Sequence, residues 1–279
     1  VGENFLYDYS IINEKISPYE LQGQFDFPLY GALRDALIPA QVNLSNLNAF
    51  VYSSFIDYQG ISDLDWSKEG DAANGTLMGN FLGNHDVERF SSVAAGDASG
   101  DGCQAFNAPL VAQSSDSSIY QRMALGFAFL LSVRGLPVIY YGDEIGLAGV
   151  KDPDNRRTMV FEDGQLLSDQ VELRQRVSAI IHARNDFPSL RRGRYDAFHG
   201  EPGCLVFLKS LGTERVLVVL SGGEGCNATV TMKEGYGFQD GESLTDILSG
   251  TDQVTINSSQ IVLTEEPWSV RLYHMDTVK

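Results

Sequence analysis

Carboxylates and one histidine follow apolar, strand-like runs at two places in this chain, and a further carboxylate stands near its start. Asn84-His85-Asp86 follows the run 76–82, Asp143-Glu144 follows the run 136–141, and Glu3 opens the sequence. Such side chains perform general acid–base chemistry. When they end successive strands that alternate with helices, they gather at one edge of a (β/α) barrel. The spacing therefore predicts chemistry on a polar, ring-shaped substrate.

Composition narrows the classes of partner. The chain has 279 residues, of which 43% are hydrophobic and 20% charged, as in a globular protein with a substantial core. Its formal net charge of −17 argues against a nucleic-acid partner, because phosphates need a basic surface. We attribute this charge to solubility. No segment approaches the roughly 20 apolar residues of a membrane span, so none is expected.

The three cysteines lack the spacing of a metal site, and we predict no metal ligands or cofactor in this segment. Cys204 and Cys226 either form a disulfide in an oxidising compartment or remain free thiols, and the odd number, which includes Cys103, leaves at least one cysteine unpaired in the chain. Residues 97–102 resemble the start of a calcium loop. The acid expected at the twelfth position is replaced by Ala108, so a plain surface loop is predicted.

The periodicity of apolar residues divides the chain near Arg192. Helical spacing predicts helices at about 28–37, 45–60, 119–134 and 168–185, with Ser45 as the cap of the second and strand-like runs between them. From Tyr195 onward, short runs with a period of two predict strands separated by Gly, Asn and Asp. An α/β unit is therefore followed by an all-β unit.

These motifs, in this order, resemble those of the α-amylase superfamily, glycoside hydrolase family thirteen. Val1-Gly2-Glu3 resembles the motif that ends barrel strand five, Phe81 to Asp86 the strand-seven motif, and Gly135 to Glu144 the strand-eight motif. Asp152 to Arg157 resembles a donor-subsite loop of members that form cyclodextrins, act on oligosaccharides or saccharify starch. Gly83 replaces the aspartate usual at a variable position.

The resemblance implies a particular fold. Residues 1–192 would form the second half of a (β/α)8 TIM barrel, and residues 193–279 an antiparallel β-sandwich equivalent to the family's domain C. Strands one to four, with the nucleophilic aspartate, would then lie upstream of Val1. We expect the chain to be catalytically incomplete alone and to need that upstream half as its partner. Any calcium is expected in the upstream half.

The resemblance also implies roles for individual residues. Glu3 would be the general acid/base, and Asp86 a third carboxylate that stabilises the transition state. His85 would donate a hydrogen bond to a hydroxyl of the same sugar, and Asn84 would orient the pair.

Three other charged residues have two interpretations each. Asp152 and Arg156 would bind a sugar two or three units from the cleaved bond, or form an exposed salt bridge in a solvated loop. Arg89 is expected to be a structural ion-pair partner rather than a substrate ligand.

The function implied is retaining hydrolysis of α-1,4-glucosidic bonds in starch-like glucans or maltooligosaccharides. A transglycosylase that forms cyclodextrins or moves glucosyl units would have the same architecture. A non-catalytic binding subunit is the third alternative, and the presence of Glu3, His85 and Asp86 argues against it. The size of an α-glucan leads us to expect a secreted or periplasmic protein.

Overall fold

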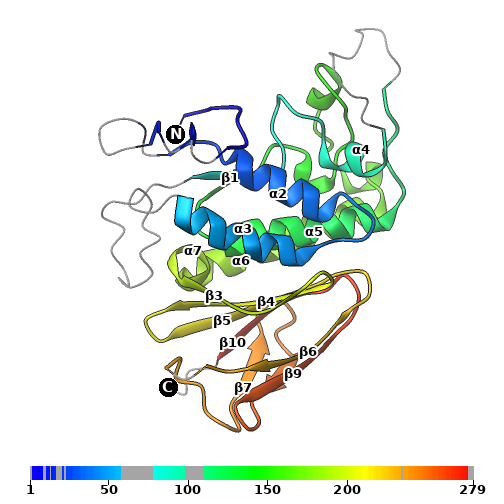
Figure 1. The fold of residues 1–279 in the computed structure, drawn as a ribbon. Coiled ribbons are helices and arrows are strands. Elements are labelled where there is room, and N and C mark those ends of the chain that lie inside the picture. Colours follow the sequence, from blue (N-terminus) through cyan, green and yellow to red (C-terminus); the bar gives the residue numbers. More distant parts are fainter. Residues whose placement is uncertain are drawn as a thin grey trace.

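The fold is a layer of helices and short parallel strands placed on a layer of antiparallel sheet (Figure 1). The computed structural model describes residues 2–8, 11–12, 14–16, 21, 23–57, 78–97, 110–233 and 235–275. The helical layer contains α2 (Phe27–Leu37), α3 (Leu44–Asp57), α4 (Phe90–Ala94), α5 (Ser117–Ser132), α6 (Ser168–Asp186) and α7 (Pro188–Arg192), together with β1 (Gly79–Phe81) and β2 (Leu136–Val138).

The parallel strands come in the order of the sequence. Gly2 pairs with Gln24, Phe25 pairs with Gly79, and β1 pairs with β2, all in parallel. Segments that follow these strands therefore leave at the same edge of the sheet. Within residues 23–26, before α2 begins at Phe27, strand pairing is limited to the single bridges at Gln24 and Phe25.

The helices form largely where the apolar spacing predicts them. Asp26 caps α2 by accepting a hydrogen bond from the Leu29 amide at 3.0 Å. The α5 helix is buried almost all round, in agreement with its apolar residues on every face. Ser45 is not a cap, because α3 begins one residue earlier; its hydroxyl lies 2.6 Å from Asn43 Oδ1.

Two antiparallel sheets make up the second layer. The larger has the order β3 (Arg194–Glu201), β4 (Cys204–Leu211), β5 (Glu214–Ser221), β10 (Val270–Met275), β7 (Ser243–Asp246) and β8 (Gln253–Thr255). The smaller pairs β6 (Cys226–Thr231) with β9 (Gln260–Glu265).

The central strands β4 and β5 are buried at most positions because both of their faces are covered. Leu205 and Phe207 of β4 belong to the core shared with the helices, and the Phe207 ring lies 6.1 Å from that of Phe129 in α5. The alternate residues Val206 and Leu208 belong to the core shared with β6 and β9. Successive side chains of a strand point to opposite faces, so one strand serves both cores.

A disulfide joins the two sheets. Cys204 of β4 and Cys226 of β6 are bonded, with their Cα atoms 5.0 Å apart, which decides between the two alternatives left open by the sequence. By loop entropy, closing a segment of 22 residues stabilises the fold by about 3 kcal/mol. Cys103 and most of the loop at 97–102 lie outside the described residues.

No helix in the described ranges is long and apolar enough to cross a membrane.

Asp26 makes stability depend on pH. It is 5% exposed, and burial raises its pKa to about 7, opposed by the hydrogen bond from Leu29. A carboxyl with a higher pKa in the folded than in the unfolded state favours folding less as pH rises between the two values. Asp26→Asn keeps the cap and removes the charge. The variant's advantage in free energy of unfolding over the unsubstituted protein should therefore be about 2 kcal/mol larger at about pH 8 than at about pH 5.

Denaturant titration of the full-length protein at both pH values checks this prediction. Asp116→Asn is the matched control, because Asp116 caps α5 through the Ser118 amide at 2.9 Å but is exposed. An equal gain in the control, or no change with pH in Asp26→Asn, would contradict the assignment.

Candidate active site

The segment after β1 carries the first part of the site to the surface. Phe81, Leu82 and Gly83 are buried, whereas the side chains of His85 and Asp86 are 56% and 39% exposed. Between them the Asn84 side chain is buried, and its Oδ1 accepts the Asp86 amide at 2.9 Å. Asparagine turns a chain in this way by hydrogen bonding to the amide two residues on. This bond fits the orienting role expected for Asn84.

The side chains of His85 and Arg156 both contact Asp86. His85 Nε2 lies 3.1 Å from Asp86 Oδ2, and Arg156 Nη2 lies 3.5 Å from Asp86 Oδ1. The same Arg156 nitrogen is 3.4 Å from Asp152 Oδ2, and Arg156 Nε donates to the His85 carbonyl at 3.2 Å. The fold therefore brings together five of the six residues that the sequence predicts for the site.

The Asp152–Arg156 pair exists as an exposed salt bridge, which was one of its two interpretations. Its side chains are 53% and 42% exposed, so it contributes at most about 1 kcal/mol. Such a weak pair opens readily for a hydroxylated ligand. The sugar-binding interpretation stays a prediction.

Glu3 is the sixth predicted residue, and it lies outside this contact group in the part of the chain that the structure describes. The preceding Gly2 is held against the next strand by hydrogen bonds to Gly23 O at 2.8 Å and from Phe25 N at 2.9 Å. Glu3 is exposed and leaves at the same edge as Asp86, because the intervening strands are parallel. Its convergence with Asp86 on one sugar stays a prediction.

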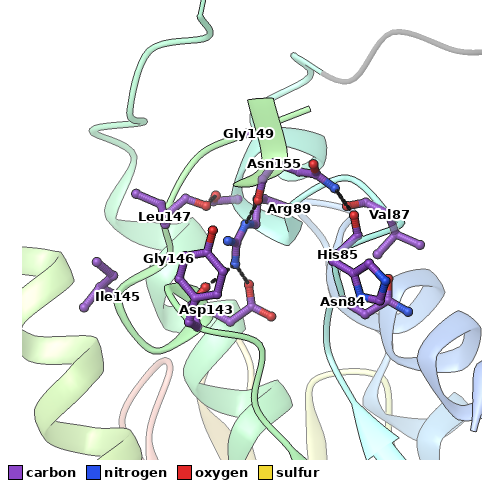
Figure 2. Close-up of polar contacts among 12 residues, drawn as sticks. Asn84, His85, Val87, Arg89, Asp143, Ile145, Gly146, Leu147, Gly149 and Asn155 are labelled. Carbon is purple, nitrogen blue, oxygen red and sulfur yellow. Dashed lines mark hydrogen bonds and ion pairs between the residues drawn. The ribbon is translucent and has the colours of Figure 1, made fainter. Parts of the chain in front are cut away.

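Arg89 is a buried structural residue, as expected from the sequence. It is 1% exposed, and Nη1 donates to Asp143 Oδ1 at 2.8 Å and to Tyr141 O at 2.7 Å (Figure 2). Its guanidinium lies 4.0 Å from the centre of the Tyr140 ring. Burial raises the pKa of Asp143 to about 6 while Arg89 opposes the rise, so Asp143 is ionised and paired near neutral pH. This ion pair fixes the turn after β2 beneath the site.

Gly83 has a steric role that sequence reasoning missed. A Cβ at Gly83 would lie 2.6 Å from Asp143 Oδ2. The buried carboxylate occupies the space that a side chain would need, which explains why glycine replaces the aspartate usual in the resembling motif. No local pattern in the sequence contains this information, because the two residues follow different strands and are far apart in the chain.

Adding a side chain at Gly83 should disturb the site. Gly83→Ala is expected to lower the free energy of unfolding by about 1–3 kcal/mol, the usual effect of overpacking. Gly164→Ala is the matched control, because nothing lies within 4 Å of the added Cβ. The cost of Gly83→Ala should shrink when Asp143 is also replaced by alanine, and denaturant titration of the double variant measures this. An unchanged cost would show that Asp143 is not the obstacle.

A carboxylate at an open strand edge can stabilise developing positive charge, and the imidazole and guanidinium beside it can hydrogen bond to the hydroxyls of a sugar. The described part of the chain holds no group of three or more His, Cys, Asp or Glu side chains suited to a metal ion.

Parallel strands that alternate with helices and end in polar side chains define an α/β protein with its site at the carboxyl edge of the sheet. Residues 13–189 match the family model for the α-amylase catalytic domain, and the chain belongs to the α-amylase family. The matched region begins after Glu3, so it does not test the catalytic role expected for that residue.

Known relatives are longer than this chain. A cyclomaltodextrinase of Geobacillus thermopakistaniensis (strain MAS1) is 32% identical over 144 residues, which cover 51% of this chain and 20% of the relative. A β/α-amylase of Paenibacillus polymyxa is 26% identical over 91% of this chain and 18% of its own length. An α-amylase of Geobacillus thermoleovorans, solved with acarbose, superposes with a TM-score of 0.75 at 24% identity. That match covers all of this chain and 53% of the solved one, and it shows the fold alone.

Proposed function

We propose that this protein, in its full-length form, is a retaining glycoside hydrolase that cleaves α-1,4-glucosidic bonds of starch-like glucans or maltooligosaccharides. The observation that carries the proposal is the Asp86 carboxylate, exposed at a strand end and held by His85 and Arg156 in a member of the α-amylase family.

In this mechanism Glu3 protonates the glycosidic oxygen of the leaving sugar. The nucleophile is a carboxylate upstream of this chain, about 5–5.5 Å from the acid. It attacks the anomeric carbon and forms a covalent glycosyl-enzyme. Asp86 and His85 hydrogen bond to hydroxyls of the reacting ring. These bonds strengthen as positive charge develops in the transition state, which is the condition for catalysis rather than mere binding. Arg156 and Asp152 separate to hold a sugar further along the glucan.

The upstream half of the barrel is the proposed partner of the parallel strands. Leu136 of β2 is 44% exposed, an apolar side chain in a strand that a closed barrel would cover. We propose that the protein is secreted or periplasmic. The Cys204–Cys226 disulfide supports this, because disulfides persist in oxidising compartments.

The stereochemistry of the first product tests the proposal. The full-length enzyme should release the α-anomer from maltooligosaccharides, as followed by proton NMR before mutarotation, because double displacement retains configuration. Release of the β-anomer would exclude the retaining mechanism. Absence of any reducing sugar would favour a non-catalytic binding subunit.

A transglycosylase is the second candidate, because the loop of Asp152 and Arg156 resembles a donor-subsite loop of family members that form cyclodextrins. Chromatography of the products separates the two activities. Cyclic products, or products longer than the substrate, would dominate for a transglycosylase at early times.

A further inference from the structure

One buried amide holds the backbone on both sides of Asp86. Asn155 belongs to the 3₁₀ turn Asp154–Arg156 and is 1% exposed. Its Nδ2 donates to the carbonyls of His85 at 2.8 Å and Val87 at 2.9 Å, the residues that flank Asp86 (Figure 2). The other end of the His85–Asp86 peptide is already bound by Asn84. The main chain that carries the Asp86 carboxylate is therefore fixed by two asparagines.

Asn155 is itself anchored to the buried ion pair. Its carbonyl accepts a hydrogen bond from Arg89 Nε at 2.9 Å, and Arg89 is bound to Asp143 below (Figure 2). The turn also packs directly on the backbone of Gly149, where an added Cβ would lie 2.7 Å from Asn155 Cα. Two independent contacts thus determine where the amide of Asn155 points.

The neighbour of Asn155 reaches the same carboxylate from the solvent side. Arg156 lies 3.5 Å from Asp86 Oδ1 and 3.4 Å from Asp152 Oδ2. Consecutive residues of one turn therefore bind the backbone of the His85–Val87 segment and the side chain of Asp86. A displacement of this turn moves the loop of Asp152 and the carboxylate of Asp86 together.

We propose that Asn155 is a positioning residue for the glycosidase reaction, which sets the place of Asp86 and couples it to the Asp152–Arg156 loop. The inference rests on the proposed function, since it concerns the same site. A misplacement of about 1 Å in a catalytic group costs about 10²-fold in rate. Asn155→Asp replaces the donor with an oxygen that repels both carbonyls, so the segment must shift.

Asn155→Asp in the full-length enzyme should lower kcat on maltooligosaccharides by about 10- to 100-fold, with KM changed far less, because an interaction made in the transition state is lost. Asn80→Asp is the matched control. Asn80 is also buried and donates to Arg134 O at 2.8 Å from within β1, before the chain reaches the site. It should lower the melting temperature but change kcat by no more than about twofold, as expected of a purely structural hydrogen bond.

The coupling to Asp86 is tested by combining substitutions. In an Asp86→Asn background, Asn155→Asp should lower kcat by no more than about twofold, because the group that it positions is already lost. An undiminished effect there, or an equal loss of kcat in Asn80→Asp, would reduce Asn155 to a structural residue and overturn the inference. Asn155→Ser keeps one donor, so its kcat should lie between those of the unsubstituted enzyme and Asn155→Asp. It replaces Asn155→Asp in the test if the aspartate variant does not fold.

The two proposals fail in different ways. If the unsubstituted full-length enzyme releases no sugar, both the proposed function and this inference are wrong. If that enzyme is active and folded Asn155→Asp keeps its kcat, the function stands and the inference alone is wrong.

Discussion

Glu3→Gln in the full-length enzyme should lower kcat by about 10²- to 10⁴-fold, the range that a positioned general acid contributes. Glutamine has the same size but cannot give its proton to the leaving glycosidic oxygen. The loss should be smaller on an aryl glycoside with an acidic phenol, because that leaving group departs without protonation. Steady-state rates on a maltooligosaccharide and on such an aryl glycoside measure both parts of the prediction.

The matched control is Glu162→Gln, which also removes one exposed carboxylate but lies after the Asp152–Arg157 loop. It should leave both rates unchanged. Near-normal turnover in Glu3→Gln, or an equal loss on both substrates, would refute the role of Glu3 as the acid. This test matters most for Glu3, since no described contact joins it to the rest of the site.

Asp86→Asn should lower kcat by about 10²- to 10³-fold, as when one preorganised electrostatic group is removed from a transition state. The amide keeps the shape of the carboxylate but loses the charge that faces His85 and Arg156 at 3.1 and 3.5 Å. Because Asp86 acts on the charged ring and not on the leaving group, an aryl glycoside should not restore the rate. This distinguishes Asp86 from Glu3 in the same assay.

Asp163→Asn is the control for Asp86, because Asp163 is 63% exposed and also pairs with an arginine, Arg174. Its kinetics should match those of the unsubstituted enzyme. Full activity in Asp86→Asn would contradict the proposed mechanism. A rise in KM with unchanged kcat would show that Asp86 binds the substrate and the transition state equally strongly.

Local patterns in the sequence predict much of this fold. The apolar residues of α5 and α6, and the period of two in β6 and β9, are dictated by the burial of each element. The period of two expected for β4 and β5 is wrong, because both faces of these strands are buried and their apolar runs are nearly continuous. The boundary of the run 136–141 is less well predicted. β2 ends at Val138, and Tyr140 lies against the Arg89 guanidinium instead of extending the sheet.

The sequence by itself determined the apolar runs and the polar residues that follow them, because both depend on residues close together in the chain. Only the tertiary structure decided that Arg156 faces Asp86 and that Asn155 binds the carbonyl of His85, 70 positions away along the chain. It also decided that Gly83 makes room for Asp143. These contacts depend on how separate elements pack, and packing has no local signature in a sequence.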